Sequence, residues 1–218
     1  MNGLLVTFAF LALLTGCVSK ARYDALERER DMYAAQSLAL AHDTEQLADV
    51  AATLDEELAV RDEELAQLQA TEAALREELG AELLAGRIKV QLMRDGLHVQ
   101  LSESVLFPTG SAELMDTGRG VLLRVVEELA EIPFQIAVLG YTDDVPIGAS
   151  LTARYPSNWE LAGARAASVV RVMEGAGVDP ERLVAVSFGA NDPVASNETP
   201  DGRAQNRRID IRLRPIIP

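Results

Sequence analysis

Two neighbouring carboxylates and a later arginine are the side chains here whose types and spacing could hold a charged ligand. Asp143 and Asp144 follow an apolar run that begins at Phe134, and Arg165 lies in the next segment of helical character. A carboxylate can accept hydrogen bonds from an ammonium group, and a guanidinium can donate two parallel hydrogen bonds to a carboxylate. An acid at a strand end and a base on the following helix can therefore hold a zwitterion.

The helix that carries Arg165 is predicted from its start and stop signals. Ser157 followed by Glu160 has the capping-box pattern, and the helical pattern stops at Gly175. We therefore expect a helix over residues 158–174.

One edge of this helix should face the end of the preceding strand. Asn158, Leu161 and Arg165 share that edge, because seven residues are close to two helical turns. Beside it runs an apolar stripe that should face the core, made of Ala162, Ala166, Val169 and Met173.

Three ordered motifs carry a resemblance to a known family. They are Gly140-Tyr-Thr142-Asp143, then Asn158-Trp-Glu-Leu161 with Arg165-Ala166, then Gly202-Arg-Ala-Gln-Asn206-Arg207-Arg208. With them, roughly residues 97 to 214 resemble the OmpA-like peptidoglycan-binding domain. This resemblance implies non-catalytic binding of the peptidoglycan stem peptide at its diaminopimelate residue.

The free end of diaminopimelate carries an ammonium and a carboxylate on one carbon, which suits the two charged positions. We assign Asp143 to the ammonium and Arg165 to the carboxylate, with Asn158 at the same group. The resemblance adds four further ligand-binding positions: Thr142, Leu161, Asn206 and Arg207.

The basic run near the C-terminus has two interpretations. Arg203, Arg207 and Arg208 could pair with local acids such as Asp201 and Asp210. Alternatively, Asn206 and Arg207 could frame the binding cleft, as the resemblance implies. Both interpretations stay open, since the sequence does not show which way the guanidinium groups point.

The first residues resemble a bacterial lipoprotein signal. The apolar run from Leu4 to Leu14 is shorter than the roughly 20 residues that a membrane span needs. It ends in Leu14-Thr-Gly-Cys17, which resembles a lipobox, and Cys17 is the only cysteine. We predict a signal peptide at 1–16 and lipidation of Cys17 at the periplasmic face of the outer membrane. An ordinary secretory signal is the alternative.

Residues 17–80 are predicted to form a lipid-attached helical stalk. From Lys20 to Leu79 there is no glycine or proline, so a continuous helix would be roughly 90 Å long at 1.5 Å per residue. A heptad frame places leucine at most d positions, so we expect a coiled coil that makes a homo-oligomer, firmer over residues 54–79. A solvated single helix or a partly disordered spacer is the alternative.

Residues 97–218 should form the binding domain, after a linker and the start of a hairpin at 81–96. Strands are expected near 97–101, 134–139, 183–188 and 208–213, with one helix that ends before Pro133 and another at 158–174. Two helices against one sheet make an α+β two-layer sandwich of βαβαββ order.

Charge and histidine content argue against several function classes. The formal net charge is −14, and the segment from Lys20 to Gly80 holds sixteen acids against six bases, so we expect no nucleic-acid partner. His42 and His98 lack sequence neighbours for a metal site or a catalytic triad. We therefore expect no enzyme activity and no cofactor.

Two functions remain in different classes. The first is a lipoprotein that tethers the outer membrane to the cell wall by binding peptidoglycan. The second is a scaffold or assembly component of an envelope-spanning machine, stator-like or secretion-related, whose coiled coil is the working part.

Substitution of the lipobox cysteine tests the predicted anchor. Cys17→Ser should leave an uncleaved precursor and release the protein from the membrane fraction, because several buried acyl chains are needed for stable attachment. Immunoblotting of membrane and soluble fractions measures both effects. Normal processing with unchanged membrane partition would end the lipoprotein interpretation.

Overall fold

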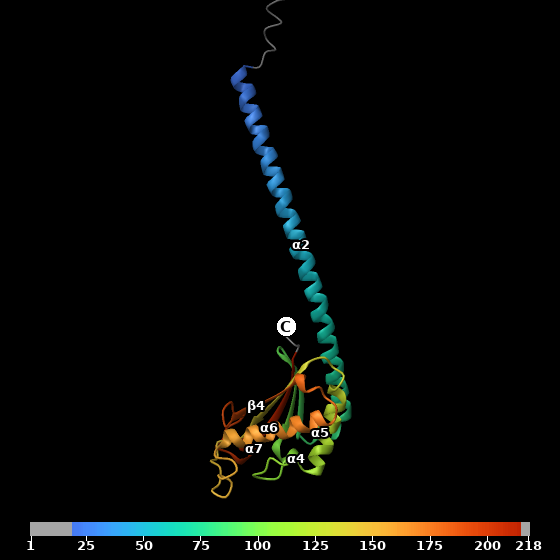
Figure 1. The fold of residues 1–218 in the computed structure, drawn as a ribbon, viewed down its shortest axis with the longest axis vertical. Helices are drawn as coiled ribbons and strands as arrows, with labels where there is room; N and C mark the ends of the chain where they lie inside the picture. Colours follow the sequence, from blue (N-terminus) through green and yellow to red (C-terminus); the bar gives the residue numbers. More distant parts are fainter. Residues whose placement is uncertain (1–18, 215–218) are drawn as a thin grey trace, which may run out of the picture. The chain divides into compact units, whose positions relative to one another are not determined.

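The computed structural model describes residues 19–214 of the 218-residue chain. The predicted signal peptide and the lipidation of Cys17 lie outside these residues. The chain divides between Val60 and Arg61 into two compact units. Figure 1 labels the helices and strands.

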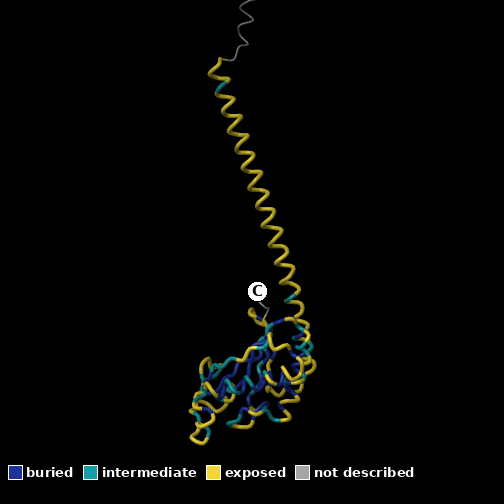
Figure 2. The backbone as a smooth tube through the Cα atoms, in the orientation of Figure 1, coloured by how far each residue is buried: buried dark blue, intermediate teal, exposed yellow. Residues whose placement is uncertain are grey.

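The first unit consists of the N-terminal part of helix α2, which as a whole runs from Lys20 to Glu78. Apolar side chains in this part, including Leu40 and Leu47, are exposed, and Figure 2 draws this part almost wholly in yellow. The predicted helix is confirmed, while its self-association stays a prediction. Among residues 19–214, no helix has an apolar stretch long enough to cross a membrane.

The second unit begins earlier than residue 97, where the sequence had placed the domain. Leu68, Leu75 and Leu79 are buried in its hydrophobic core. The expected firm coiled coil over 54–79 is therefore wrong at these three leucines, because their apolar faces are already covered within the chain. The segment predicted as a linker and the start of a hairpin contains helix α3 (Gly80–Leu84), which was not predicted, and strand β1 (Ile88–Met93), which is the first strand of the hairpin.

A five-stranded sheet forms the centre of this unit. Its strand order is β1-β2-β5-β3-β4, with β3 and β4 parallel and the other neighbours antiparallel. The predicted α+β fold and βαβαββ order are confirmed, with β1 as an added edge strand. The remaining strands are β2 (Gly96–Ser102), β3 (Gln135–Tyr141), β4 (Leu183–Gly189) and β5 (Arg208–Arg214).

Two main helices, α5 (Asp116–Leu129) and α6 (Asn158–Gly175), pack on one face of the sheet (Figure 1). The predicted apolar stripe of α6 is buried at all four of its residues, Ala162, Ala166, Val169 and Met173, so the hydrophobic periodicity correctly indicated the face that meets the core. Shorter elements complete the unit: α4 (Glu103–Leu106), a 3-10 turn (Pro180–Arg182) and α7 (Pro200–Asn206).

The predicted capping box fixes the start of α6. The Ser157 hydroxyl accepts a hydrogen bond from Trp159 N at 3.2 Å, and the Glu160 carboxylate accepts one from Ser157 N at 2.8 Å. Backbone donors at a helix start have no partner inside the helix, so these bonds stabilise this end. The cap thereby sets the first turn, in which Asn158 lies.

Strand β3 and helix α6 approach each other closely at Gly140. A Cβ atom at this residue would lie 2.2 Å from the carbonyl oxygen of Ala162. Only glycine permits this approach, because a methyl group would need the space that the helix backbone occupies. The first motif therefore begins with glycine for a packing reason.

Adding that methyl group should loosen the contact between β3 and α6. Gly140→Ala should lower the free energy of unfolding by about 1–3 kcal/mol through overpacking. Urea denaturation measures it, with Gly120→Ala in α5 as the control. A Cβ at Gly120 meets nothing within 4 Å, so that variant should be as stable as wild type or more so. Equal stability of Gly140→Ala and wild type would contradict the packing argument.

Candidate functional site

The ends of strands β2, β3 and β5 lie together at one end of the sheet. The last residues of β2 and β3 both lie opposite Arg208, the first residue of β5. One step further out come Glu103, Thr142 and Arg207. The register therefore brings an acid, a hydroxyl and a base together at one edge.

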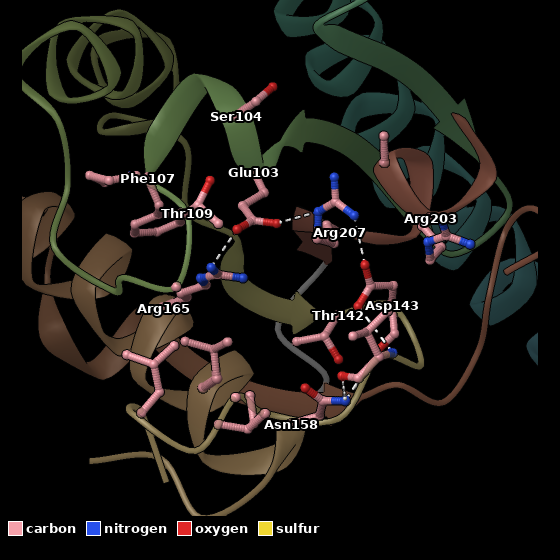
Figure 3. Close-up of a pocket in the computed structure, with 18 of the residues that line it drawn as sticks. Glu103, Ser104, Phe107, Thr109, Thr142, Asp143, Asn158, Arg165, Arg203 and Arg207 are labelled. Atoms are coloured by element: carbon pink, nitrogen blue, oxygen red, sulfur yellow. Dashed lines mark hydrogen bonds and ion pairs between the residues drawn. The ribbon is translucent and has the colours of Figure 1, made fainter. Parts of the chain in front are cut away.

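A cavity of about 610 Å³ opens at this edge (Figure 3). Its charged lining includes Glu103, Asp143, Arg165 and Arg207, and loops at residues 107–110 and 145–148 form further parts of its wall. This volume lies in the range usual for sites that bind small ligands.

Arg165 lies in the cavity wall, as predicted, but it has a partner that the sequence analysis missed. Its side chain is nearly inaccessible, with a relative exposure of 2% for the residue. Nη2 donates to Glu103 Oε1 at 2.5 Å, and Nε donates to the carbonyl of Ser111 at 2.9 Å. Burial lowers the pKa of the guanidinium, and the charge of Glu103 opposes that shift. Glu103 is therefore the counter-charge that keeps this buried cation tolerable.

Arg207 links Glu103 to Asp143. Its Nε lies 2.8 Å from Glu103 Oε2, and its Nη1 donates to Asp143 Oδ2 at 2.6 Å. Arg165, Glu103, Arg207 and Asp143 thus alternate in sign, and we call them the four-charge chain (Figure 3). Two acids balance two bases, so these four side chains carry no net charge together.

Asn158 holds the loop that carries Asp143. Its amide donates to the carbonyl of Asp143 at 3.2 Å and to the carbonyl of Val145 at 3.0 Å. Asp143 Oδ1 in turn accepts from Val145 N at 3.3 Å, while Asp144 is exposed. Asn158 therefore faces the strand end as predicted, and its amide orients the Asp143 backbone.

Thr142 and Leu161 also line the cavity. The Thr142 hydroxyl is buried and has no hydrogen-bond partner among the described residues. An unsatisfied buried hydroxyl costs about 1–3 kcal/mol, so a ligand group that bonds to it would recover part of that cost.

Asn206 does not line the cavity, and its predicted place in the cleft is wrong. It is fully buried, and its Oδ1 accepts from the backbone of Val194 at 2.8 Å and of Ala195 at 2.9 Å. Its amide donates to the carbonyl of Ala195 at 2.8 Å and to Asn197 Oδ1 at 2.7 Å. Both ends of the side chain are engaged in holding this loop, so Asn206 is structural.

The arginines of the basic run near the C-terminus do not all have the same role: two line the cavity and one pairs with a local acid. Arg203 and Arg207 line the cavity. Arg208 is buried over the ring of Tyr141, with its guanidinium carbon 3.7 Å from the ring centre, and its Nε lies 3.9 Å from Asp210 Oδ2. Arg208 therefore pairs with a local acid, as one interpretation expected.

No group of three or more potential metal ligands gathers anywhere in residues 19–214. On the β1–β2 hairpin, His98 Nε2 lies 3.0 Å from Asp95 Oδ1, and these two side chains form an isolated contact.

Comparison with known proteins identifies the family. Residues 106–207 match the OmpA family. The solved cell wall anchor of the T6SS from Pseudomonas aeruginosa is 34% identical, with a TM-score of 0.60, and the match covers 65% of this chain and 96% of that one. Residues 106–207 of this chain form a domain of the OmpA family.

Another solved structure, a putative MotB like protein from Desulfovibrio vulgaris, is 29% identical with a TM-score of 0.64. That match covers 71% of the present chain and 98% of the other, which confirms the OmpA-type fold.

Curated relatives within the family match over shorter parts. The probable lipoprotein YiaD of Escherichia coli is 34% identical over 130 residues, which is 59% of this chain and 56% of YiaD. The uncharacterized protein YtxE of Bacillus subtilis is 37% identical over 120 residues, covering 55% and 48% of the two chains. The chain thus spans about half the length of these relatives.

Proposed function

We propose that this protein binds peptidoglycan without cleaving it, at the diaminopimelate residue of the stem peptide. Membership of the OmpA family supports the ligand. The observation that carries the proposal is the four-charge chain, which lines a cavity of about 610 Å³ with two acids and two bases in alternation. Such a site suits a ligand that bears both signs of charge close together.

A zwitterion can bind to the four-charge chain without leaving any of its buried charges unpaired. The ligand carboxylate binds to the guanidinium of Arg165, and the ligand ammonium binds to the carboxylate of Asp143. The contact between Glu103 and Arg207 then persists and pairs the two remaining charges. Since an unpaired buried charge costs several kcal/mol, roughly 3–5 when a partner is removed, this exchange favours zwitterions over simple ions.

Neutral parts of the site suit the rest of the ligand. Leu161 and Ile147 offer apolar surface to the methylene chain of diaminopimelate, and the Thr142 hydroxyl can bond to a polar group of the ligand. These residues contribute binding and orientation, and no catalytic step is assigned to them.

At the level of the cell, we propose a tether between the outer membrane and the cell wall. Lipid on Cys17 would hold the membrane, and the second unit would hold peptidoglycan from the periplasmic side. The lipobox-like sequence and the similarity to a probable lipoprotein support this arrangement.

Substitution of the two ligand-facing charges tests the proposed binding. Asp143→Ala and Arg165→Lys should each weaken binding of a diaminopimelate-containing stem peptide roughly 30-fold or more, since a partner of a desolvated charge pair is lost. Lysine keeps the charge of Arg165 but cannot donate two parallel hydrogen bonds. Calorimetric titration measures the affinity, and circular dichroism verifies folding.

The matched control is Asp144→Ala, which removes the neighbouring exposed carboxylate. It should bind almost as well as wild type. Unchanged affinity in both folded Asp143 and Arg165 variants would remove the proposed site.

A second candidate is a scaffold of an envelope-spanning machine, in which α2 is the working part. Two observations favour it. Apolar d positions such as Leu40 and Leu47 are exposed on α2, and the solved relatives include a cell wall anchor of the T6SS. In this case the helix would bind a second copy of the chain or another component of the assembly.

A charge placed at a heptad d position tests whether α2 self-associates or serves only as a tether. Leu47→Asp should turn a self-associated protein into a monomer, because a buried carboxylate opposes helix pairing. Leu38→Asp is the control, since Leu38 is equally apolar and exposed but lies outside the a and d positions. Sedimentation equilibrium gives the mass. A monomeric wild type at high concentration would leave α2 as a tether only.

A further inference from the structure

We infer that Glu103 occupies the place where Arg165 would bind a ligand carboxylate. Glu103 would then be a competitor within the chain that sets both affinity and charge selectivity. The identity of the ligand rests on the proposed function, whereas the place of Glu103 rests on the geometry of the pocket.

The contacts of Glu103 resemble those of a bound carboxylate. Its side chain begins at the first residue of α4, reaches the cavity wall, and sets Oε1 2.5 Å from Arg165 Nη2. Its second oxygen, Oε2, is buried and accepts no hydrogen bond within residues 19–214, although Arg207 Nε lies 2.8 Å away. Glu103 is therefore bonded through one oxygen only, and its contact with Arg207 is one of charge.

This arrangement leaves Glu103 free to change partners. Losing Arg165 would cost it one hydrogen bond, while Arg207 would remain as a counter-charge. Arg165 keeps its bond to the Ser111 carbonyl and gains the ligand carboxylate in exchange. No charged side chain is left alone in either state, so Glu103 can yield to a ligand at moderate cost.

Charge selectivity follows from the same exchange. A simple carboxylate on Arg165 would leave Glu103 and Asp143 to share Arg207, and this local excess of negative charge opposes its binding, while Arg203, which also lines the cavity, forms no ion pair with any of these four side chains within residues 19–214. A zwitterion adds no net charge. Replacing Glu103 with a neutral residue removes one negative charge and should therefore open the site to simple carboxylates.

Glu103→Gln keeps the size of the side chain and removes its charge, so it is the decisive variant. In thermal unfolding, sodium acetate should raise the melting temperature of Glu103→Gln by several degrees relative to sodium chloride at equal ionic strength. Wild type should show no such difference. The control is Glu113→Gln, which removes an exposed acid paired with Arg154 outside the cavity lining.

Calorimetric titration with the stem peptide gives the second readout. Glu103→Gln should bind about tenfold more tightly than wild type, because the internal competitor no longer holds Arg165. Glu103→Asp retains the charge but withdraws the carboxylate from Arg165, so it should also bind more tightly and serves if the glutamine variant does not fold.

The outcomes separate this inference from the proposed function. Weaker peptide binding by the folded Glu103 variants, with no acetate effect, would show that Glu103 only holds Arg165 in place and would overturn the inference. Acetate stabilisation of Glu103→Gln without peptide binding by any form, wild type included, would support the inference and refute diaminopimelate as the ligand.

Discussion

A buried guanidinium must keep a counter-charge, and this constraint organises the binding end of the protein. Arg165 is almost inaccessible, so Glu103 must reach it from the end of β2. Glu103 also balances Arg207, which in turn contacts Asp143 at the end of β3. One requirement thus joins α6 to strand ends that are distant in sequence. The charges that can recognise a ligand also hold these elements together.

Local patterns predicted the elements that carry the site, but they could not predict every contact within it. The capping box and apolar stripe of α6 correctly placed Asn158 and Arg165 on the edge facing β3. Glu103 was missed because it lies 62 residues from Arg165 in sequence, and only the strand register brings the two together. Asn206 was misassigned because membership of a motif does not say whether a side chain faces a cavity or a loop.

The heptad pattern of α2 shows a second limit of periodicity. Leucines at heptad spacing favour packing against an apolar partner, but the spacing does not show whether that partner is another helix or the core of the same chain. Leu68 and Leu75 pack into the core of their own unit, whereas Leu40 and Leu47 are exposed. The same repeat therefore serves intramolecular packing in one part of the helix and stays unpartnered in another part of the single chain.

The close contact at Gly140 limits how near strand β3 and helix α6 can come to each other. Because a Cβ there would lie 2.2 Å from the backbone of Ala162, strand and helix have no room to slide toward each other. Asp143 leaves that strand and Arg165 leaves that helix, so the backbone sets the distance between the two anchoring charges. If the site binds the proposed zwitterion, it would therefore discriminate among ligands by the distance between their two charged groups.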